Sequence, residues 1–255
     1  MLLLPLSQES GPTIEAQAGF DGLYETSLAV PVVVTARNEG QPFDGEVRII
    51  SPGTGGAGAL VYSAPLTLPG GADKRVPLVV YMAPFSGRLT AQLVADGRVV
   101  AEVETNRLTG LGRDDLLYGV VSPEPGGLAF LETIQGSRSD AAVAFVALDD
   151  LPEVSSAWDA LDILVLDDID TSRLTSGQLA ALRAWVENGG QLVVIGGPGG
   201  PKTAAGVAEL LPMAVTGVES LTNLSALGDF GGAPLSGEGP FVVTTGSLIA
   251  GETMI

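Results

Sequence analysis

The stretch LDILVLDDIDTSRLTSGQLAALRAWVENGGQLVVIGG, residues 161–197, decides how the C-terminal half of the chain is expected to fold. It opens with a continuous apolar run at 161–166 and closes with another at 191–196. Runs of this kind are typical of strands that are buried on both faces of a sheet. Apolar residues at helical spacing lie between them, so the stretch predicts a strand, a helix and a second, parallel strand.

The predicted helix has a marked beginning and a marked end. Thr175 and Gln178 fit the T-x-x-Q capping box, in which each side chain accepts a backbone N–H group of the other residue. Leu179 and Leu182 then fall on one face of the helix. Gly189 supplies the left-handed residue that commonly ends a helix. These signals make this segment the most clearly defined helix of the sequence.

Flanking segments continue the pattern on both sides. Their apolar spacing predicts strands at 116–122, 141–148 and 241–249, and helices at 126–135 and 201–211. The sequence therefore predicts an α/β domain with a parallel sheet over residues 116–255.

The N-terminal half has a different period. Between residues 12 and 106, apolar and polar residues alternate in about seven short runs with turn signals between them, which is typical of a β-sandwich. Asp96 and Gly97 separate two such runs and predict a tight hairpin. We therefore predict an immunoglobulin/fibronectin-like sandwich over residues 10–108. A polar, glycine-bearing stretch between Leu108 and Asp115 is interpreted as a linker between two separately folding domains.

Composition excludes several classes of function. Lys and Arg number 12 against 30 Asp and Glu, so the formal net charge is −18 and nucleic acid is not an expected partner. Cys and His are both absent. The chain can therefore form no disulfide, Cys nucleophile, Ser-His-Asp triad or Cys/His zinc site. Any catalysis would have to use carboxylates, hydroxyls, Lys, Tyr or a hard metal ion.

Acidic side chains gather directly after the first apolar run of the opening stretch. Asp167, Asp168 and Asp170 are followed by the hydroxyl of Ser172, and ligands of open parallel sheets bind at such loops. Carboxylates suit hard cations, so this loop is a candidate Ca²⁺ or Mg²⁺ site and could carry a carboxylate- or metal-dependent hydrolase. The alternative is that Asp170 or Thr171 only shapes the turn before the helix. No other cofactor is expected.

A glycine-rich loop follows the second apolar run. Residues 196–203 come within one position of the phosphate-binding pattern G-x-x-x-x-G-K-[ST]. Pro201 stands where that pattern has a glycine, and proline has no N–H group to offer a phosphate. We therefore expect a crossover loop here and not a nucleotide site.

Residues 162–197 resemble the core of the class I glutamine amidotransferases. That family pairs a D-[IL]-L-V-L strand and an L-T-x-x-Q helix with W-V-x-x-G-G and a strand that ends in the nucleophile elbow. The first three of these motifs occur here. The resemblance implies a flavodoxin-like sheet. The catalytic cysteine of the family falls on Gly196 or Gly197, and its histidine partner is also missing. The resemblance therefore implies a degenerate, non-catalytic domain.

A degenerate domain of this kind behind an immunoglobulin-like domain resembles bacterial surface proteins that continue into a membrane anchor. The resemblance implies a non-catalytic binding or scaffold protein of the cell envelope, extracytoplasmic and membrane-anchored, with a protein or glycan ligand. The anchor would lie outside these 255 residues, because no stretch reaches the ~18–20 apolar residues that cross a bilayer.

The two ends of the sequence lead to separate expectations. Residues 1–10 are either the stub of a signal peptide or a frayed terminus, because their leucine run is short and lacks basic residues. Residues 251–255 stop as a strand begins, so we expect the second domain to continue beyond Ile255.

Overall fold

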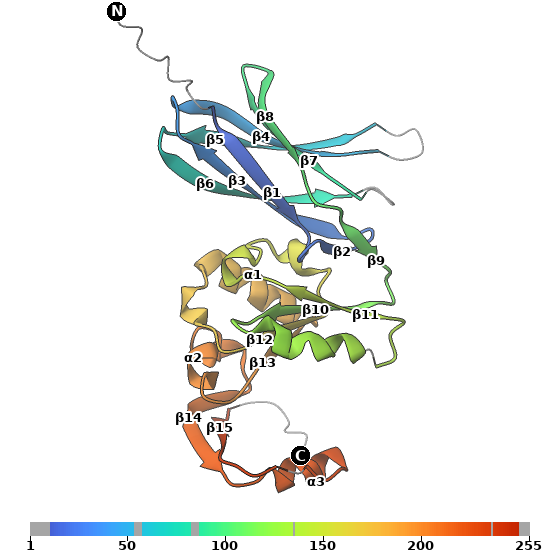
Figure 1. The fold of residues 1–255 in the computed structure, drawn as a ribbon, viewed down its shortest axis with the longest axis vertical. Coiled ribbons are helices and arrows are strands. Elements are labelled where there is room, and N and C mark those ends of the chain that lie inside the picture. Colours follow the sequence, from blue (N-terminus) through green and yellow to red (C-terminus); the bar gives the residue numbers. More distant parts are fainter. Residues whose placement is uncertain (1–10, 54–57, 83–86, 135, 236, 250–255) are drawn as a thin grey trace, which may run out of the picture. The chain divides into compact units, whose positions relative to one another are not determined.

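The computed structural model describes residues 11–53, 58–82, 87–134, 136–235 and 237–249 of the chain. The two terminal interpretations, for residues 1–10 and 251–255, lie outside this range. The chain divides into two compact units (Figure 1). The first comprises the residues up to Asp115 together with Ser156–Ala160, and the second comprises the remainder.

The first unit contains a three-stranded and a four-stranded sheet, both antiparallel. The three-stranded sheet has the order β1 (Thr13–Ala18), β3 (Ala29–Asn38), β6 (Ala72–Tyr81). The four-stranded sheet has the order β5 (Leu60–Leu68), β4 (Phe43–Ser51), β7 (Thr90–Ala95), β8 (Arg98–Glu104). This arrangement fits the sandwich that the alternation predicts.

Alternate residues of the strands supply the sandwich core. Val32 and Val34 of β3 and Val47 and Ile49 of β4 belong to one apolar cluster and are at most 1% exposed. Complete burial of such a side chain contributes roughly 1.5–3 kcal/mol relative to leaving it in water. The period of two in the sequence is thus the period at which side chains enter the core.

A two-residue turn joins β7 to β8. Asp96 has φ 48° and Gly97 has φ 74°, and a type I′ turn requires positive φ at both of its central residues. The hairpin predicted from this Asp-Gly pair is confirmed.

The predicted linker is in part a strand. Residues Thr109–Leu111 form β9, which pairs in parallel with β2 (Leu23–Glu25), and Leu108 is buried. The glycine in β9 allows close packing: a Cβ at Gly110 would lie 2.9 Å from the Thr26 side chain. Residues 109–111 of the predicted linker therefore form a strand of the first unit, and the boundary between the two units falls after Asp115, where the predicted linker ends.

The second unit begins with four parallel strands in the order β11, β10, β12, β13. Their bounds are Leu116–Val121 for β10, Ala141–Phe145 for β11, Ile163–Leu166 for β12 and Gln191–Val194 for β13. Helix α1 (Ser176–Glu187) connects β12 to β13 and buries Ala181, Leu182 and Trp185. Its capping box between Thr175 and Gln178 is present as predicted.

The predicted flavodoxin-like α/β domain is nevertheless wrong. The chain is mostly β-structure, with 44% strand against 21% helix. The segment predicted as a helix at 126–135 is the 3₁₀ helix η1 (Pro125–Thr133), and only η2 (Leu148–Asp150) and η3 (Ser155–Trp158) lie between β11 and β12. Two glycines open η1, and each costs about 1 kcal/mol relative to alanine inside an α-helix. The crossovers from β10 to β11 and from β11 to β12 therefore lack the α-helices that cover a doubly wound sheet.

The chain leaves the parallel arrangement after β13. There it forms the short helices α2 (Gly200–Ala205) and η5 (Ala208–Leu210) in place of the one helix predicted at 201–211, while the 3₁₀ turn η4 (Thr171–Arg173) precedes α1. An antiparallel ribbon of β14 (Met213–Leu221) and β15 (Phe241–Leu248) follows, with α3 (Ser225–Gly231) between its strands (Figure 1). Among the described residues, no helix has the length and apolar character needed to cross a membrane.

Candidate functional site

The acidic loop lies where β12 ends, beside the end of β10. Asp167 Oδ2 accepts a hydrogen bond from the Ser122 hydroxyl at 2.8 Å, and Ser122 directly follows β10. The Ser122 Oγ in turn accepts the N–H of Glu124 at 3.1 Å. Asp167 therefore joins the ends of two neighbouring strands.

Asp168 turns to a different partner. Its backbone has φ 45°, and its carboxylate forms an ion pair with Lys202, with Oδ1 2.7 Å from Nζ. The same Nζ donates to the Asp168 carbonyl oxygen at 2.8 Å. A Cβ on Gly199 would overlap this carboxylate, so the missing side chain admits it. Both charged groups are about half-exposed, and such pairs contribute about 1 kcal/mol or less.

Asp170 serves as the N-cap of η4. Its Oδ1 accepts the Ser172 hydroxyl at 2.6 Å and the Ser172 N–H at 3.1 Å. The Ser172 hydroxyl, followed by its N–H group, holds the pKa of Asp170 below its usual value. Ser172 is thus a partner of Asp170 within the turn.

Two buried threonines fasten this loop to α2. Thr203 Oγ1 accepts the N–H of Ile169 at 3.1 Å and donates to Gly199 O at 3.1 Å. Thr171 Oγ1 donates to Thr203 O at 2.8 Å and accepts the N–H of Gly206 at 2.8 Å. These hydrogen bonds hold the loop against α2. They agree with the alternative interpretation, in which Asp170 or Thr171 shapes the turn before the helix.

The three carboxylates of the loop thus have three separate sets of partners. Within the described parts of the chain, no group of three or more acidic side chains is arranged to hold a metal ion. Among these residues, Asp167, Asp168 and Asp170 do not form the set of metal ligands that the metal-dependent hydrolase alternative would need.

The glycine loop after β13 is joined to β15. Gly197, with φ 111°, donates its N–H to Thr244 Oγ1 at 3.0 Å, and the Thr244 hydroxyl donates to Gly197 O at 3.1 Å. A Cβ on the neighbouring Gly196 would lie 3.5 Å from the same Thr244 oxygen. The loop and the ribbon therefore meet at one reciprocal pair of hydrogen bonds.

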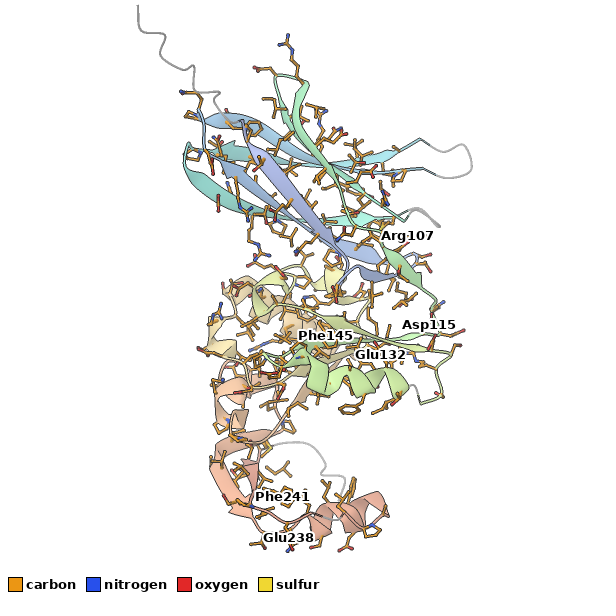
Figure 2. All side chains as sticks on the ribbon, viewed as in Figure 1. Arg107, Asp115, Glu132, Phe145, Glu238 and Phe241 are labelled. Atoms are coloured by element: carbon orange, nitrogen blue, oxygen red, sulfur yellow. The ribbon has the colours of Figure 1, made fainter. Side chains whose placement is uncertain are left out.

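An apolar groove of about 810 Å³ lies beside this junction. Strand β13 lines it with Leu192 and Val194, and Gly196 and Gly197 continue the lining past the end of the strand. The ribbon and α3 contribute Met213, Val215, Leu227, Phe241, Val242 and Val243. Figure 2 shows Phe241 on β15, with Glu238 nearby on the preceding segment.

The lining of the groove restricts its chemistry. Among the described residues that line it, Thr244 supplies the one polar side chain and none carries an ionisable group. Acid–base catalysis needs a titratable side chain within hydrogen-bond reach of the reacting atoms. A concave surface of this size with few polar groups has the form of a binding site.

Comparison with known proteins adds a family match in the first unit. Residues 11–107 match a family described as a domain of unknown function, DUF8726. The match covers the sandwich and leaves the groove outside it. No curated protein matches the chain.

The solved structures that are similar to parts of the chain include the following two. One is the CARDB domain of the PF1109 protein from Pyrococcus furiosus in complex with di-metal ions, with TM-score 0.30 and 13% identity over 44% of this chain and 100% of that chain. The other is a cycloisomaltooligosaccharide glucanotransferase from Paenibacillus sp. complexed with cycloisomaltoheptaose, with TM-score 0.30 and 11% identity. That match covers 72% of this chain but only 28% of the enzyme. Likenesses this weak carry no argument about function.

The comparisons do not indicate a class I glutamine amidotransferase-like domain, and that resemblance is wrong. The motifs behind it describe a capped helix between two buried strands, and this pattern is local. The fold is decided by the crossovers, the number of strands and the course of the chain after β13. Residues 162–197 hold two of the strands and one crossover, and the other parts lie outside them. The interpretation of Gly196 and Gly197 as a degenerate elbow rested on the resemblance. In the structure they form one end of the groove.

Sequence reasoning missed most of the groove. It predicted a strand at 241–249 but neither β14 nor α3. The alternation of Met213 and Val215 and the spacing of Leu224 and Leu227 were available signals. Thr244 carried no signal, because its partner Gly197 lies 47 positions away in the sequence.

Proposed function

We propose that this chain is a non-catalytic binding or scaffold protein that holds an apolar segment of a partner in the groove beside β13. The observation that carries the proposal is a groove of about 810 Å³ whose described lining is apolar except for Thr244. Burial of apolar surface, at about 25 cal/mol per Å², would supply the binding energy.

The lining favours a protein segment over a glycan as the ligand. Sugar hydroxyls that leave water need replacement hydrogen bonds, and Thr244 is the one described side chain of the lining that can form them. The location expected from the sequence, outside the cytoplasm on the bacterial cell envelope, stays part of the proposal.

Binding of the neutral dye Nile red, whose fluorescence rises in apolar sites, tests whether the groove takes up an apolar group. Leu227 lines the groove and is 55% exposed, whereas Phe130 of η1 is 54% exposed and lies outside it. The variants Leu227→Ser and Phe130→Ser therefore remove equally exposed apolar side chains from different places. We expect Leu227→Ser to weaken dye binding several-fold and Phe130→Ser to leave it unchanged, with melting temperatures recorded for both.

Two results would count against the proposal. The unmodified chain could fail to enhance the dye fluorescence, or both variants could weaken binding equally. Either outcome would mean that the groove has no special affinity for apolar groups.

A further inference from the structure

We infer that the partner segment is an extended strand with basic residues, and that it adds to the free edge of β13. This inference rests on the proposed function and specifies the occupant of the same groove. Three observations support it: the hydrogen-bonding state of the β13 edge, the apolar character of that edge, and the charge around the groove.

Strand β13 has one free edge among the described residues. Among these residues β13 pairs with β12 alone. On the β12 side, Gln191 and Ile195 donate their N–H groups to carbonyl oxygens at 3.1 Å and 2.9 Å. Successive residues of a strand direct their N–H and C=O groups to opposite edges. Leu192 and Val194 therefore direct theirs away from β12, where an added strand would find donors and acceptors.

The free edge carries none of the side chains that commonly protect an edge strand. Exposed edge strands commonly carry charged residues, proline or a bulge, which prevent pairing with other chains. The segment Leu192, Val193, Val194 has none of these, and Val193 is 40% exposed. Leu192 and Val194 also line the groove. A docking strand would thus gain main-chain hydrogen bonds and side-chain burial together, as in β-strand addition.

The charge around the groove indicates which strand would bind. The sequence from Thr203 to Ile255 contains no Lys or Arg. Glu219 of β14 pairs with Val243, which lines the groove. Asp229 of α3 and Glu238 before β15 lie two residues from Leu227 and Pro240, which also line it. All three carboxylates are exposed, and no ion pair joins them to a described residue. These carboxylates complement Lys or Arg side chains of a bound strand. A second copy of the chain would bring another net charge of −18 and is disfavoured as the occupant.

The test is a selection of random nine-residue peptides, displayed on phage, against the purified full chain. We expect enriched peptides with alternating apolar residues together with Lys or Arg. Synthetic versions should lose about tenfold in affinity when the backbone amides that face β13 are N-methylated. Their affinity should also fall as salt is raised, and in the double variant Asp229→Asn, Glu238→Gln.

Two variants of β13 separate main-chain pairing from side-chain contact. Val194→Pro removes an N–H group at the free edge, a position where an edge strand tolerates proline, and should weaken peptide binding about tenfold. Val194→Ala trims the side chain but keeps that N–H group, and should weaken binding less. The N-methylated peptides give the same information if Val194→Pro does not fold.

Three outcomes would overturn the inference. The first is that the selection enriches no peptide, and the second is that the enriched peptides are insensitive to N-methylation. The third is that the chain dimerises through β13 in a concentration-dependent way that Val194→Pro abolishes. Nile red binding that depends on Leu227 would stand in each case. Failure of the strand inference is therefore distinguishable from failure of the proposed function.

Discussion

Gln178 and Thr175 exchange hydrogen bonds at the start of α1. The Gln178 N–H donates to Thr175 Oγ1 at 3.1 Å, and the Thr175 N–H donates to Gln178 Oε1 at 3.0 Å. The Gln178 amide nitrogen also donates to the carbonyl oxygens of Leu148 and Leu151, at 3.1 Å and 2.9 Å. One buried side chain therefore caps the helix and ties it to η2.

Replacing Thr175 with alanine should lower the free energy of unfolding by about 1 kcal/mol, because the N–H of Gln178 loses its acceptor. Urea denaturation measures the change. Thr175→Ser keeps the hydroxyl and is the matched control, which should stay close to the unmodified protein. An unchanged midpoint for Thr175→Ala would contradict a role for this cap in stability.

Replacing Gln178 with glutamate separates its two functions. Glutamate can still accept the Thr175 N–H group but cannot donate to the Leu148 and Leu151 carbonyl oxygens when ionised. Those buried oxygens would lose a donor, so we expect a loss of roughly 1–3 kcal/mol in the free energy of unfolding. Gln178→Glu should thus be at least as destabilising as Thr175→Ala. Stability equal to that of the unmodified protein would show that the ties to η2 contribute little.

Replacing Gly190 with alanine should disturb the packing of α1. A Cβ at this position would overlap the ring of Trp185, whose Nε1 donates to Leu161 O at 3.2 Å. Overpacking of this kind typically costs 1–3 kcal/mol, so the melting temperature and the near-ultraviolet circular dichroism should both change. Gly126→Ala is the control, since a Cβ there has no neighbour within 4 Å. Equal stability of the two variants would contradict the tight contact.

Replacing Ser172 with alanine should raise the pKa of Asp170 towards its usual value of 3.8, because the hydroxyl that lowers it most is lost. A carboxyl group with a lowered pKa in the folded state stabilises the fold above its unfolded pKa, and this contribution is lost as pH falls through the folded pKa. The stability difference between the two proteins should therefore be present at neutral pH and shrink below about pH 3.8. Carbon-detected NMR titration of the Asp170 carboxyl group measures the pKa itself, and an identical curve in the variant would refute the assignment.

Calcium and magnesium should leave the melting temperature within about 1 °C of the metal-free value, because Asp167, Asp168 and Asp170 already have separate partners. An ion that bound the folded chain at a hundred times its Kd would add about 2.7 kcal/mol and raise the midpoint by several degrees. A rise of that size, lost in Asp168→Asn, would restore the metal site as a hypothesis.

Local features of the fold could be predicted from the sequence. The capping box of Thr175 and Gln178 and the turn at Asp96 and Gly97 depend on residues within a few positions of one another. Their geometry is set by backbone sterics and neighbouring hydrogen bonds, which the rest of the fold hardly alters. The absence of Cys and His likewise excludes mechanisms in whatever fold the chain adopts.

The candidate site could be predicted only in part. The sequence placed an acidic loop after a strand. The partners of its carboxylates are distant in the sequence, however: Ser122 lies 45 positions from Asp167, and Lys202 lies 34 positions from Asp168. The sequence also marked Gly196 and Gly197, yet assigned them to an elbow because a local resemblance suggested one. Their contact with Thr244 and their place in the groove depend on how the chain returns after β13.

The sequence by itself thus determined the alternating strands of the sandwich, the capped helix α1 and the chemistries that are excluded, because these follow from short-range periodicity and composition. Only the tertiary structure decided that the crossovers around η1, η2 and η3 are 3₁₀ and not α-helical, and that β14 and β15 form an antiparallel ribbon. It also decided that β13 keeps an apolar edge with no strand partner among the described residues. The same apolar spacing is compatible with several packings. Which packing forms depends on contacts between residues far apart in the chain, which local spacing does not specify.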